Sequence, residues 1–211
     1  MKLQKALSSS PRSDLIVEMV QMVSGLLLVL FLWTHMLFVG SILLGSNAFN
    51  GLALFMEKYY LVPAAVVFLL LVGGAHIGAV IRRIPSRWAE QKIVWKHAKL
   101  IHHVDTWSWL FQSVTGGAIL VLVIIHVAVV VYGGIDVIYS AGRIKHGFLI
   151  FYAVLLLLAE YHASVGLYRI FVKWGWVKRH KLHWVLGVIS VLTVGIGAAV
   201  LWIFFTMGVH A

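Results

Sequence analysis

The chain of 211 residues is 62% hydrophobic and 11% charged, with a mean hydropathy of +0.97, which excludes a soluble globular domain. Its formal net charge of +10 does not indicate nucleic-acid binding, because the basic residues lie where membrane topology requires them and no soluble domain presents them. The absence of cysteine excludes disulfides, thiolate-held iron–sulfur clusters and covalently attached c-type haem within this chain.

Five apolar stretches are each long enough to cross about 30 Å of hydrocarbon as a helix, which takes roughly 20 residues. We therefore predict an all-α fold, an integral membrane bundle of five transmembrane helices that forms a single domain over residues 1–211. A signal peptide is not expected, because the first apolar run is too long and lacks a small-residue cleavage site. The predicted spans are residues 19–44, 61–81, 107–132, 148–168 and 184–207.

The distribution of lysine and arginine predicts the orientation of these spans. Of the 17 basic residues, three precede the first span, six lie in residues 82–99 and five lie in residues 169–181. Only Lys58, Arg143 and Lys145 remain for the opposite side. The positive-inside rule therefore predicts a cytoplasmic N-terminus and, after five crossings, a C-terminus outside.

The connection after the second span predicts an additional helix. Residues 86–104, SRWAEQKIVWKHAKLIHHV, are too charged to cross the membrane, yet they carry tryptophan, isoleucine and leucine among the charges. We expect an amphipathic helix along the cytoplasmic interface, in contact with membrane lipid. Pro63 is expected in the first turn of the second span and Pro85 at the break after it. We identify no internal repeat, low-complexity tract or domain linker.

Four of the 11 histidines lie inside four different predicted spans, where polar groups are costly and usually functional. A rise of about 1.5 Å per residue places His76 and His162 about 9–10 Å from the cytoplasmic ends of their spans. The same rise places His35 and His126 about 25 Å from the cytoplasmic ends. The histidines thus form an inner pair (His76 and His162) and an outer pair (His35 and His126), about 15 Å apart along the membrane normal.

Two histidine pairs, each drawn from two helices, are what two bis-histidine b-type haems require, because neutral imidazole supplies one axial ligand from each face. Six-coordinate iron has no open position, which favours electron transfer over catalysis at the metal. A zinc or copper site is less consistent, because no two of these histidines share a helix at i, i+3 or i+4 and no carboxylate or thiolate completes a compact site. A proton-relay transporter stays open, but it does not explain the paired depths.

Small residues accompany the histidines. Gly25 and Gly116 each lie ten residues before a histidine of the outer pair, near the level of the inner pair. A missing side chain there could admit a porphyrin edge, and ordinary close packing of helices explains the same pattern equally well. Gly73, Gly74 and Gly117 have the same two interpretations.

Four segments around the histidines resemble a known family. They are THMLFVGSILLGSN with His35, AHIGAVIRRIP with His76, HHVDTWSWLFQSVTGG before His126 and AEYHASVGLYRIFVKWGW with His162. Together they resemble the single-chain dihaem cytochrome b membrane anchor of fumarate reductase and succinate:menaquinone oxidoreductase, over about residues 21–176. The stretch HASVGLYRIFVKWGW is highly specific.

The resemblance implies that the inner pair binds the iron of a haem proximal to the cytoplasmic subunits and the outer pair that of a distal haem. It also implies propionate contacts of the proximal haem by three residues: Gln21, Trp109 and Lys173. Polar and basic groups near a cytoplasmic membrane edge are suited to that role. Met22 departs from the family, in which serine occurs at this position. Lys173 also fits a positive-inside anchor, and the two roles are compatible.

The resemblance further implies a function within a complex of the bacterial cytoplasmic membrane. Such anchors work with a flavoprotein that carries FAD and an iron–sulfur subunit, and the complex can pair into a dimer of heterotrimers. This chain would supply the quinone end and pass electrons between menaquinol or menaquinone and the iron–sulfur subunit through two haem b groups. The dicarboxylate chemistry, fumarate reduction or succinate oxidation, would occur outside this chain. These reactions belong to anaerobic respiration and the tricarboxylic acid cycle.

Two glutamates are candidates for proton transfer. Glu160 is the only acidic residue within an apolar span, and at two residues from His162 it points to a different side of the helix. The resemblance marks it as a proton-conducting glutamate beside the haems, and a buried carboxyl satisfied by a neighbouring hydroxyl or water is the alternative. Glu57 is the only outer-side glutamate before the second span and could accept the quinol protons; a solvated loop charge is the alternative.

Two other classes of function stay open. One is the dihaem cytochrome b subunit of a hydrogenase, formate dehydrogenase or nitrate reductase, although the motifs of those proteins do not resemble VGLYRIFVKWGW. The other is a non-redox membrane anchor or transporter whose histidines only pack or relay protons. A purified protein without a Soret band would support the transporter.

Overall fold

The computed structural model describes residues 11–84, 88–102 and 104–209, and every regular element in these ranges is helical. Three short helices of other types, η1 (Ser41–Leu44), η2 (Leu69–Gly73) and η3 (Ile144–Phe148), lie between α-helices, and the backbone kinks at His146 and Gly147 within η3. The α-helices are α2 (Pro11–Gly40), α3 (Ser46–Lys58), α4 (Leu61–Phe68), α5 (Gly74–Ile81), α6 (Trp88–Ile101), α7 (Val104–Gly133), α8 (Val137–Arg143), α9 (Leu149–Lys173) and α10 (Arg179–Val209).

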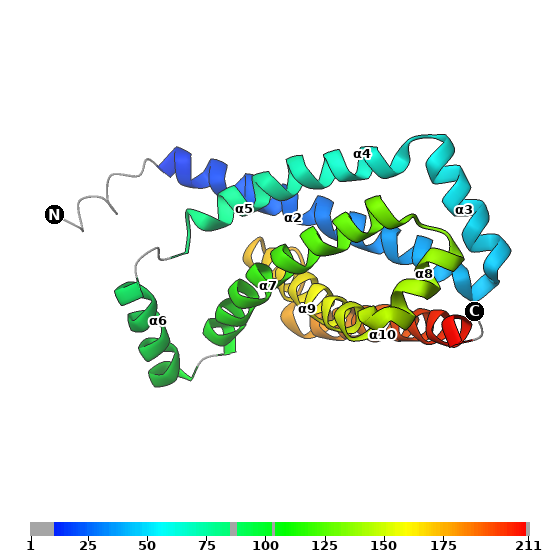
Figure 1. Cartoon of the computed structure of the whole chain (residues 1–211). Helices are drawn as coiled ribbons and strands as arrows, with labels where there is room; N and C mark the ends of the chain where they lie inside the picture. Colours follow the sequence, from blue (N-terminus) through cyan, green and yellow to red (C-terminus); the bar gives the residue numbers. More distant parts are fainter. Residues whose placement is uncertain (1–10, 85–87, 103, 210–211) are drawn as a thin grey trace.

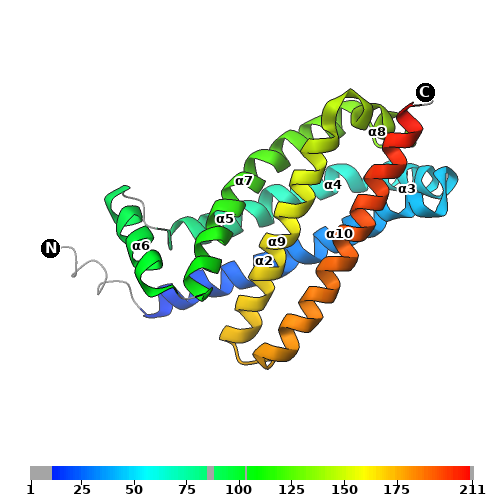
Figure 2. The same ribbon diagram turned by 90° about the horizontal axis from the view of Figure 1, so that it is seen from below.

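Five helical rods have the length and composition needed to cross a membrane, which confirms the predicted all-α membrane bundle. They run side by side in both views of the chain, with α4 and α5 joined through η2 into one rod (Figures 1 and 2). Each rod contains its predicted span and most extend beyond it. The candidate spans are Arg12–Leu44, Leu61–Ile81, Thr106–Gly133, Val137–Lys173 and Arg179–Met207.

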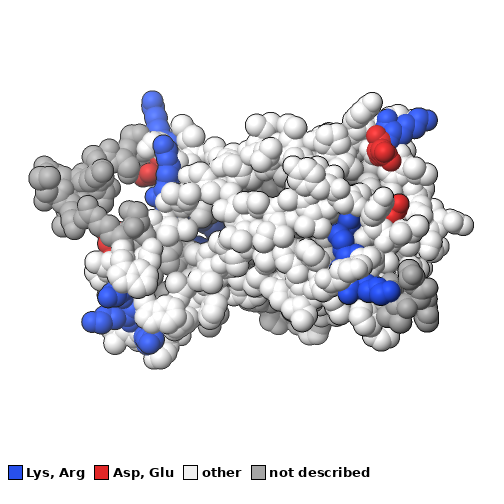
Figure 3. All heavy atoms as spheres, viewed as in Figure 1, with Lys and Arg blue, Asp and Glu red and all other residues white. Residues whose placement is uncertain are grey.

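The surface explains why these sequences form a membrane bundle. Large apolar side chains such as Leu37, Leu70, Val121 and Val191 are exposed on the outside of the rods, where lipid replaces water as the solvent. Figure 3 shows that the charged side chains on the visible face gather toward the two ends of the rods and leave its central part uncharged. An apolar band between two charged rims is the pattern of a multi-pass membrane protein.

The rods pack around two apolar clusters, one near each end of the bundle. The cluster near the C-terminus contains Ile42, Phe49, Ala141, Ile144, Val200 and Phe204. The cluster at the opposite end contains Leu167, Leu182 and Leu186. α10 contributes to both clusters and packs against α9 and α2. Of the other histidine-bearing helices, α5 packs against α2 and α7 packs against α9.

The connection between the first and second spans differs from the expectation. The sequence predicts no helix between residues 44 and 61, and the structure contains helix α3 there. Gly45 turns the chain out of the first rod with φ of 106°, a conformation that residues with a side chain rarely adopt. Phe49 of α3 is then buried against Phe38 and Phe204. The tertiary contacts of one aromatic residue thus anchor a helix whose own composition is only weakly apolar.

The additional helix after the second span is α6, which covers most of the predicted segment. It runs across the long axis of the bundle at the end where α2 begins (Figures 1 and 2). Its interfacial position and the cytoplasmic orientation of the N-terminus stay predictions. Pro63 lies in the first turn of α4 as expected, whereas Pro85, residues 86–87 and residue 103 lie outside the described residues.

Candidate functional site

The outer pair consists of two imidazoles that face each other across the bundle. His35 of α2 and His126 of α7 have ring centroids 5.9 Å apart and an interplanar angle of 68°. Two metal–imidazole bonds of about 2.0–2.1 Å place the centroids of two opposed rings about 6 Å apart. The structure therefore brings together the two histidines that the sequence places at one depth, at a separation that admits one metal ion between them.

Aromatic and basic side chains surround the outer pair. Phe31 stacks on His35 with centroids 6.0 Å apart, and Tyr152 of α9 meets His126 edge-on at 5.4 Å. Arg143 donates a hydrogen bond to the backbone oxygen of Gly134 at 2.6 Å and another to Ser140 Oγ at 3.1 Å.

The sequence pointed to neither Tyr152 nor Arg143 as part of a site. Tyr152 carries no motif, and Arg143 was interpreted only as a marker of topology. A hydroxyl within an otherwise apolar stretch is the available signal for Tyr152, whereas Arg143 lies in the polar connection before the fourth predicted span. The structure adds the edge-on contact of Tyr152 with His126, which makes Tyr152 part of the outer site.

The inner pair is fixed by hydrogen bonds from neighbouring helices. His162 Nδ1 lies 3.0 Å from the backbone oxygen of Gln112 and 3.3 Å from Thr115 Oγ1, both on α7. His76 Nδ1 lies 3.1 Å from Ser24 Oγ on α2. Each inner imidazole is therefore held by the helix it packs against, His162 by α7 and His76 by α2.

The two glycines of interest lie directly against the inner imidazoles. A Cβ atom on Gly116 would come within 2.9 Å of His162 Cε1, and one on Gly25 within 3.3 Å of His76 Cε1. Neither of the two interpretations from sequence described this contact, since the neighbour is an imidazole ring. Gly73, Gly74 and Gly117 would meet nothing within 4 Å, so they do not share this role.

The position of Gly25 on α2 gives the distance between the inner pair and the outer pair. Gly25 contacts His76 and precedes His35 by ten residues on the continuous helix α2. Ten residues correspond to about 15 Å of helix. This spacing equals the separation that the sequence predicts between the inner and outer pairs.

These residues fit haem better than a compact metal site. The described ranges contain no group of three or more His, Cys, Asp or Glu side chains placed to hold a metal ion, so each level offers two imidazoles and no third protein ligand. Two imidazoles from different helices suit an iron whose other four ligands come from a porphyrin; the ring separation is seen at the outer pair and the glycine contacts at the inner pair. The fit rests on the distance between His35 and His126 and on the contacts of Gly25 and Gly116 with the inner imidazoles.

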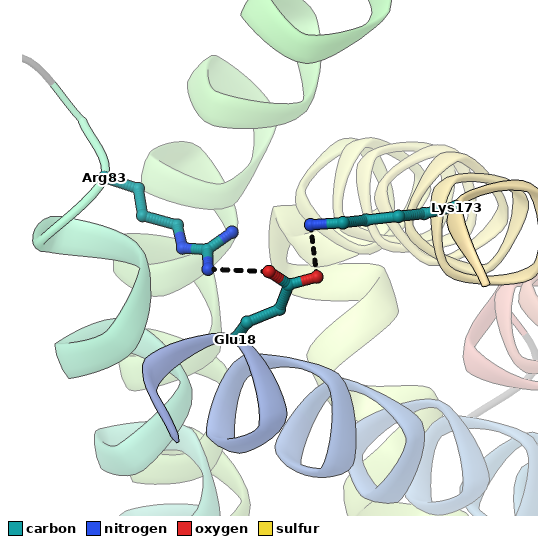
Figure 4. A network of polar contacts seen from close by, with 3 residues as sticks. All are labelled: Glu18, Arg83 and Lys173. Carbon is teal, nitrogen blue, oxygen red and sulfur yellow. Dashed lines mark hydrogen bonds and ion pairs between the residues drawn. The ribbon is translucent and has the colours of Figure 1, made fainter. Parts of the chain in front are cut away.

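A carboxylate joins three helices at the end of the bundle nearest the inner pair. Glu18 of α2 forms ion pairs with Lys173 at the end of α9 and with Arg83 after α5, whose Nη2 lies 3.4 Å from Glu18 Oε2 (Figure 4). Gln21 follows one turn after Glu18, and its Oε1 is buried without a hydrogen-bond partner among the described residues. Two of the three predicted propionate contacts, Gln21 and Lys173, therefore lie near one carboxylate.

The third predicted propionate contact, Trp109, lies half-buried in the first part of α7. Its backbone oxygen accepts a hydrogen bond from Ser113 at 3.0 Å. Arg169, on the facing helix α9, donates to the side-chain oxygen of Gln112 at 3.0 Å, close to the same end of the bundle. Arg169 and Arg83 were interpreted from sequence only as topological charges.

Glu160 is buried, with 3% of its surface exposed, and it faces α10. Its Oε1 accepts hydrogen bonds from Ser164 at 2.9 Å and from Ser190 at 2.8 Å, and the two hydroxyls are 2.7 Å apart. Its Oε2 is buried without a partner among the described residues. His162 faces α7, so the two neighbouring side chains point to different sides of α9, as expected.

Glu57 lies in the last turn of α3 and is exposed. α3 caps the end of the bundle at which the outer pair is found, outside the helices that carry the histidines (Figure 1). The structure therefore places this carboxylate at the expected end of the molecule, on a helix and not in the expected loop. Glu57 is not one of the side chains that the structure shows in contact with His35 or His126.

Comparisons with known proteins give one consistent result. Residues 89–208 match the family of the succinate dehydrogenase/fumarate reductase transmembrane subunit. The chain is 33% identical over 200 residues to the fumarate reductase cytochrome b subunit of Helicobacter pylori strain J99, which covers 83% of this chain and 76% of that protein. It is 34% identical over 167 residues to the fumarate reductase cytochrome b subunit of Wolinella succinogenes, which covers 74% of this chain and 65% of that protein.

Proposed function

The chain belongs to the succinate dehydrogenase/fumarate reductase transmembrane subunit family, and on this premise we propose that it is the dihaem, quinone-reactive anchor of such a complex. It carries electrons between menaquinol or menaquinone in the membrane and an iron–sulfur subunit. The observation that carries this proposal is the arrangement of four intramembrane histidines as two pairs on two levels. A transporter would not need both levels.

The four histidines have defined roles in this proposal. His76 and His162 hold one haem b near the end where α2 begins, and His35 and His126 hold a second near the opposite end. A bound haem supplies reversible one-electron chemistry at iron. The chain contributes the imidazoles, their orientation and a water-poor bundle interior. Gln21, Trp109 and Lys173 lie at the edge where the carboxylates of the inner haem would need polar and basic partners.

The partners follow from the family. The relatives are named as cytochrome b subunits of fumarate reductase, so we assign to this chain a flavoprotein with FAD and an iron–sulfur subunit as partners. The dicarboxylate site is in the flavoprotein. The location is the bacterial cytoplasmic membrane, and the complex pairs into a dimer of heterotrimers. The family match favours this class over a hydrogenase, formate dehydrogenase or nitrate reductase subunit.

Glu160 supplies a proton-transfer group in the membrane interior. Two serine hydroxyls hold one carboxyl oxygen, and the other oxygen has no partner among the described residues and can bind or release a proton. Its position, two residues from a haem ligand and halfway along a membrane helix, suits proton movement that accompanies electron transfer. Glu57 accepts protons from quinol at the opposite end, where its carboxylate is solvent-exposed.

The proposal is tested with the complex purified from membranes. Wild-type complex is expected to contain b-type haem, FAD and iron–sulfur clusters and to reduce fumarate with a menaquinol analogue. His162→Ala and His126→Ala are each expected to abolish quinol-linked turnover, while fumarate reduction with a soluble dye donor persists in the flavoprotein. A wild-type complex without b-type haem, or quinol-linked turnover in the histidine variants, would contradict the proposal.

A further inference from the structure

Two short segments on different helices have the same pattern. Residues 21–25 read QMVSG and residues 112–116 read QSVTG, so both have the form Q-x-V-[S/T]-G, and each is followed ten residues after its glycine by a histidine of the outer pair. This five-residue repeat is too short to stand out from the sequence alone. The structure gives it meaning, because both copies contact a histidine of the inner pair.

Both copies hold an imidazole in the same way. In the first, the ring of His76 lies against Gly25, and its Nδ1 is 3.1 Å from Ser24 Oγ. In the second, the ring of His162 lies against Gly116, and its Nδ1 is 3.3 Å from Thr115 Oγ1. The hydroxyl residues are buried, with 5% and 8% of their surfaces exposed. Each glycine leaves space for the imidazole ring, and each hydroxyl lies within hydrogen-bond distance of Nδ1 of that ring.

In the second copy, the backbone oxygen of the glutamine adds a further acceptor. Gln112 O lies 3.0 Å from His162 Nδ1. The hydroxyls of Ser24 and Thr115 direct their single protons to carbonyl oxygens of the preceding helical turn. Their oxygens are therefore left to accept from the imidazoles.

This arrangement selects one tautomer of each imidazole. A carbonyl oxygen cannot donate, and the hydroxyl proton is already used, so the imidazole proton must be on Nδ1. The lone pair of Nε2 is then free. The outer pair differs, because His126 Nδ1 is buried and has no partner among the described residues.

We infer that the two Q-x-V-[S/T]-G segments are paired cradles that orient the imidazoles of the inner pair, with Ser24 and Thr115 as positioning residues for the ligands of the inner haem. The inference rests on the proposed function, since it concerns histidines that bind iron. An acceptor on Nδ1–H makes the imidazole a more basic ligand and stabilises the oxidised metal. Loss of the acceptor therefore makes the metal easier to reduce.

The test is a redox titration of the haem-loaded complex, followed by visible spectroscopy. Ser24→Ala and Thr115→Val, alone and combined, are expected to move the midpoint potential of the inner haem to more positive values and to leave the outer haem unchanged. The inner haem is identified as the component that His162→Ala removes. The larger shift is expected in the double variant, because each imidazole loses an acceptor. Selective loss of the inner haem in the double variant would equally support the cradle.

Three controls separate this role from a general effect of losing a hydroxyl. Thr115→Ser keeps the hydroxyl, so the midpoint potential of the inner haem is expected to stay at the wild-type value. Ser113→Ala removes a hydroxyl of α7 that bonds the backbone of Trp109. Thr34→Val removes a hydroxyl beside His35 that bonds the backbone of its own helix. Both removals are expected to leave the inner haem unchanged.

The outcomes that overturn the inference are distinct from those that overturn the proposed function. An unshifted inner haem in the double variant, or equal shifts in Ser113→Ala and Thr34→Val, would show that the hydroxyls do not position the ligands. A wild-type complex without haem would instead refute the proposed function itself. The intact outer haem reports in every variant that the bundle is folded.

Discussion

His162 Nδ1 donates a hydrogen bond to the backbone oxygen of Gln112, 3.0 Å away on the neighbouring helix. This one contact fixes the tautomer of a histidine deep in the membrane bundle and leaves its other nitrogen free to bind a metal. It also places α7 against α9 at the level where Gly116 leaves room for the imidazole. The chemistry of the site thus depends on the close approach of two helices.

Substitution of the cradle glycines should remove the inner haem. Gly116→Ala would place a Cβ atom 2.9 Å from His162 Cε1, which forces the ring to move, whereas Gly25→Ala places one 3.3 Å from His76 Cε1 and requires a smaller adjustment. We expect Gly116→Ala to bind about one haem per chain in place of two. Gly25→Ala should bind an intermediate amount, and haem content per chain measures both.

Gly117→Ala is the matched control, because a Cβ atom there would meet nothing within 4 Å. It should retain both haems. Equal haem losses in Gly116→Ala and Gly117→Ala would mean that the contact with His162 is not the cause.

Glu160→Gln should keep both haems and slow turnover with a menaquinol analogue. Glutamine preserves the size of the side chain and can still bond the hydroxyls of Ser164 and Ser190, but it cannot bind and release a proton. Loss of a positioned proton-transfer group typically costs roughly 10²-fold or more in rate. Stopped-flow oxidation of quinol by the complex measures the effect.

The control is Glu90→Gln, on helix α6 outside the membrane spans. It makes the same chemical change and should not slow turnover. Turnover and charge movement at wild-type levels in Glu160→Gln would remove the proton-transfer role.

Glu18→Gln should make the inner haem easier to reduce with little loss of stability. The change removes a negative charge at the end of the bundle where we propose the inner haem, together with both ion pairs, to Arg83 and Lys173. Ion pairs as exposed as these contribute about 0–1 kcal/mol, so the thermal unfolding temperature should fall only slightly and the difference should shrink at high salt.

Asp14→Asn removes the same charge one turn earlier on α2. Its effect on the midpoint potential of the inner haem should be smaller. If the two variants shift the potential equally, the position of Glu18 among Arg83 and Lys173 has no special influence on the haem.

The membrane bundle could be predicted because the length of an apolar run decides whether a helix can cross a bilayer. Helix α3 could not, because its residues are only partly apolar and its packing depends on Phe49 meeting residues distant in sequence. The pairing of His35 with His126, whose ring centroids lie 5.9 Å apart, could also be predicted, because a helix has a constant rise per residue.

The surroundings of the histidines required the structure. Whether Gly116 faces a porphyrin, a helix or an imidazole depends on the rotation of α7 against α9, which the sequence does not specify. The bond from Ser190 to Glu160 likewise joins two helices whose facing sides are set by packing. Contacts between side chains and a neighbouring backbone, such as His162 with Gln112, leave no sequence pattern long enough to recognise.

The most direct test of this account is the haem content of the wild-type complex and of four single variants, measured by reduced-minus-oxidised spectra with redox titration. Wild type should show two low-spin b-type components. His76→Ala and His162→Ala should each remove one and the same component, and His35→Ala and His126→Ala should each remove the other. A single wild-type component, or a component lost in both His35→Ala and His76→Ala, would contradict the two-level arrangement.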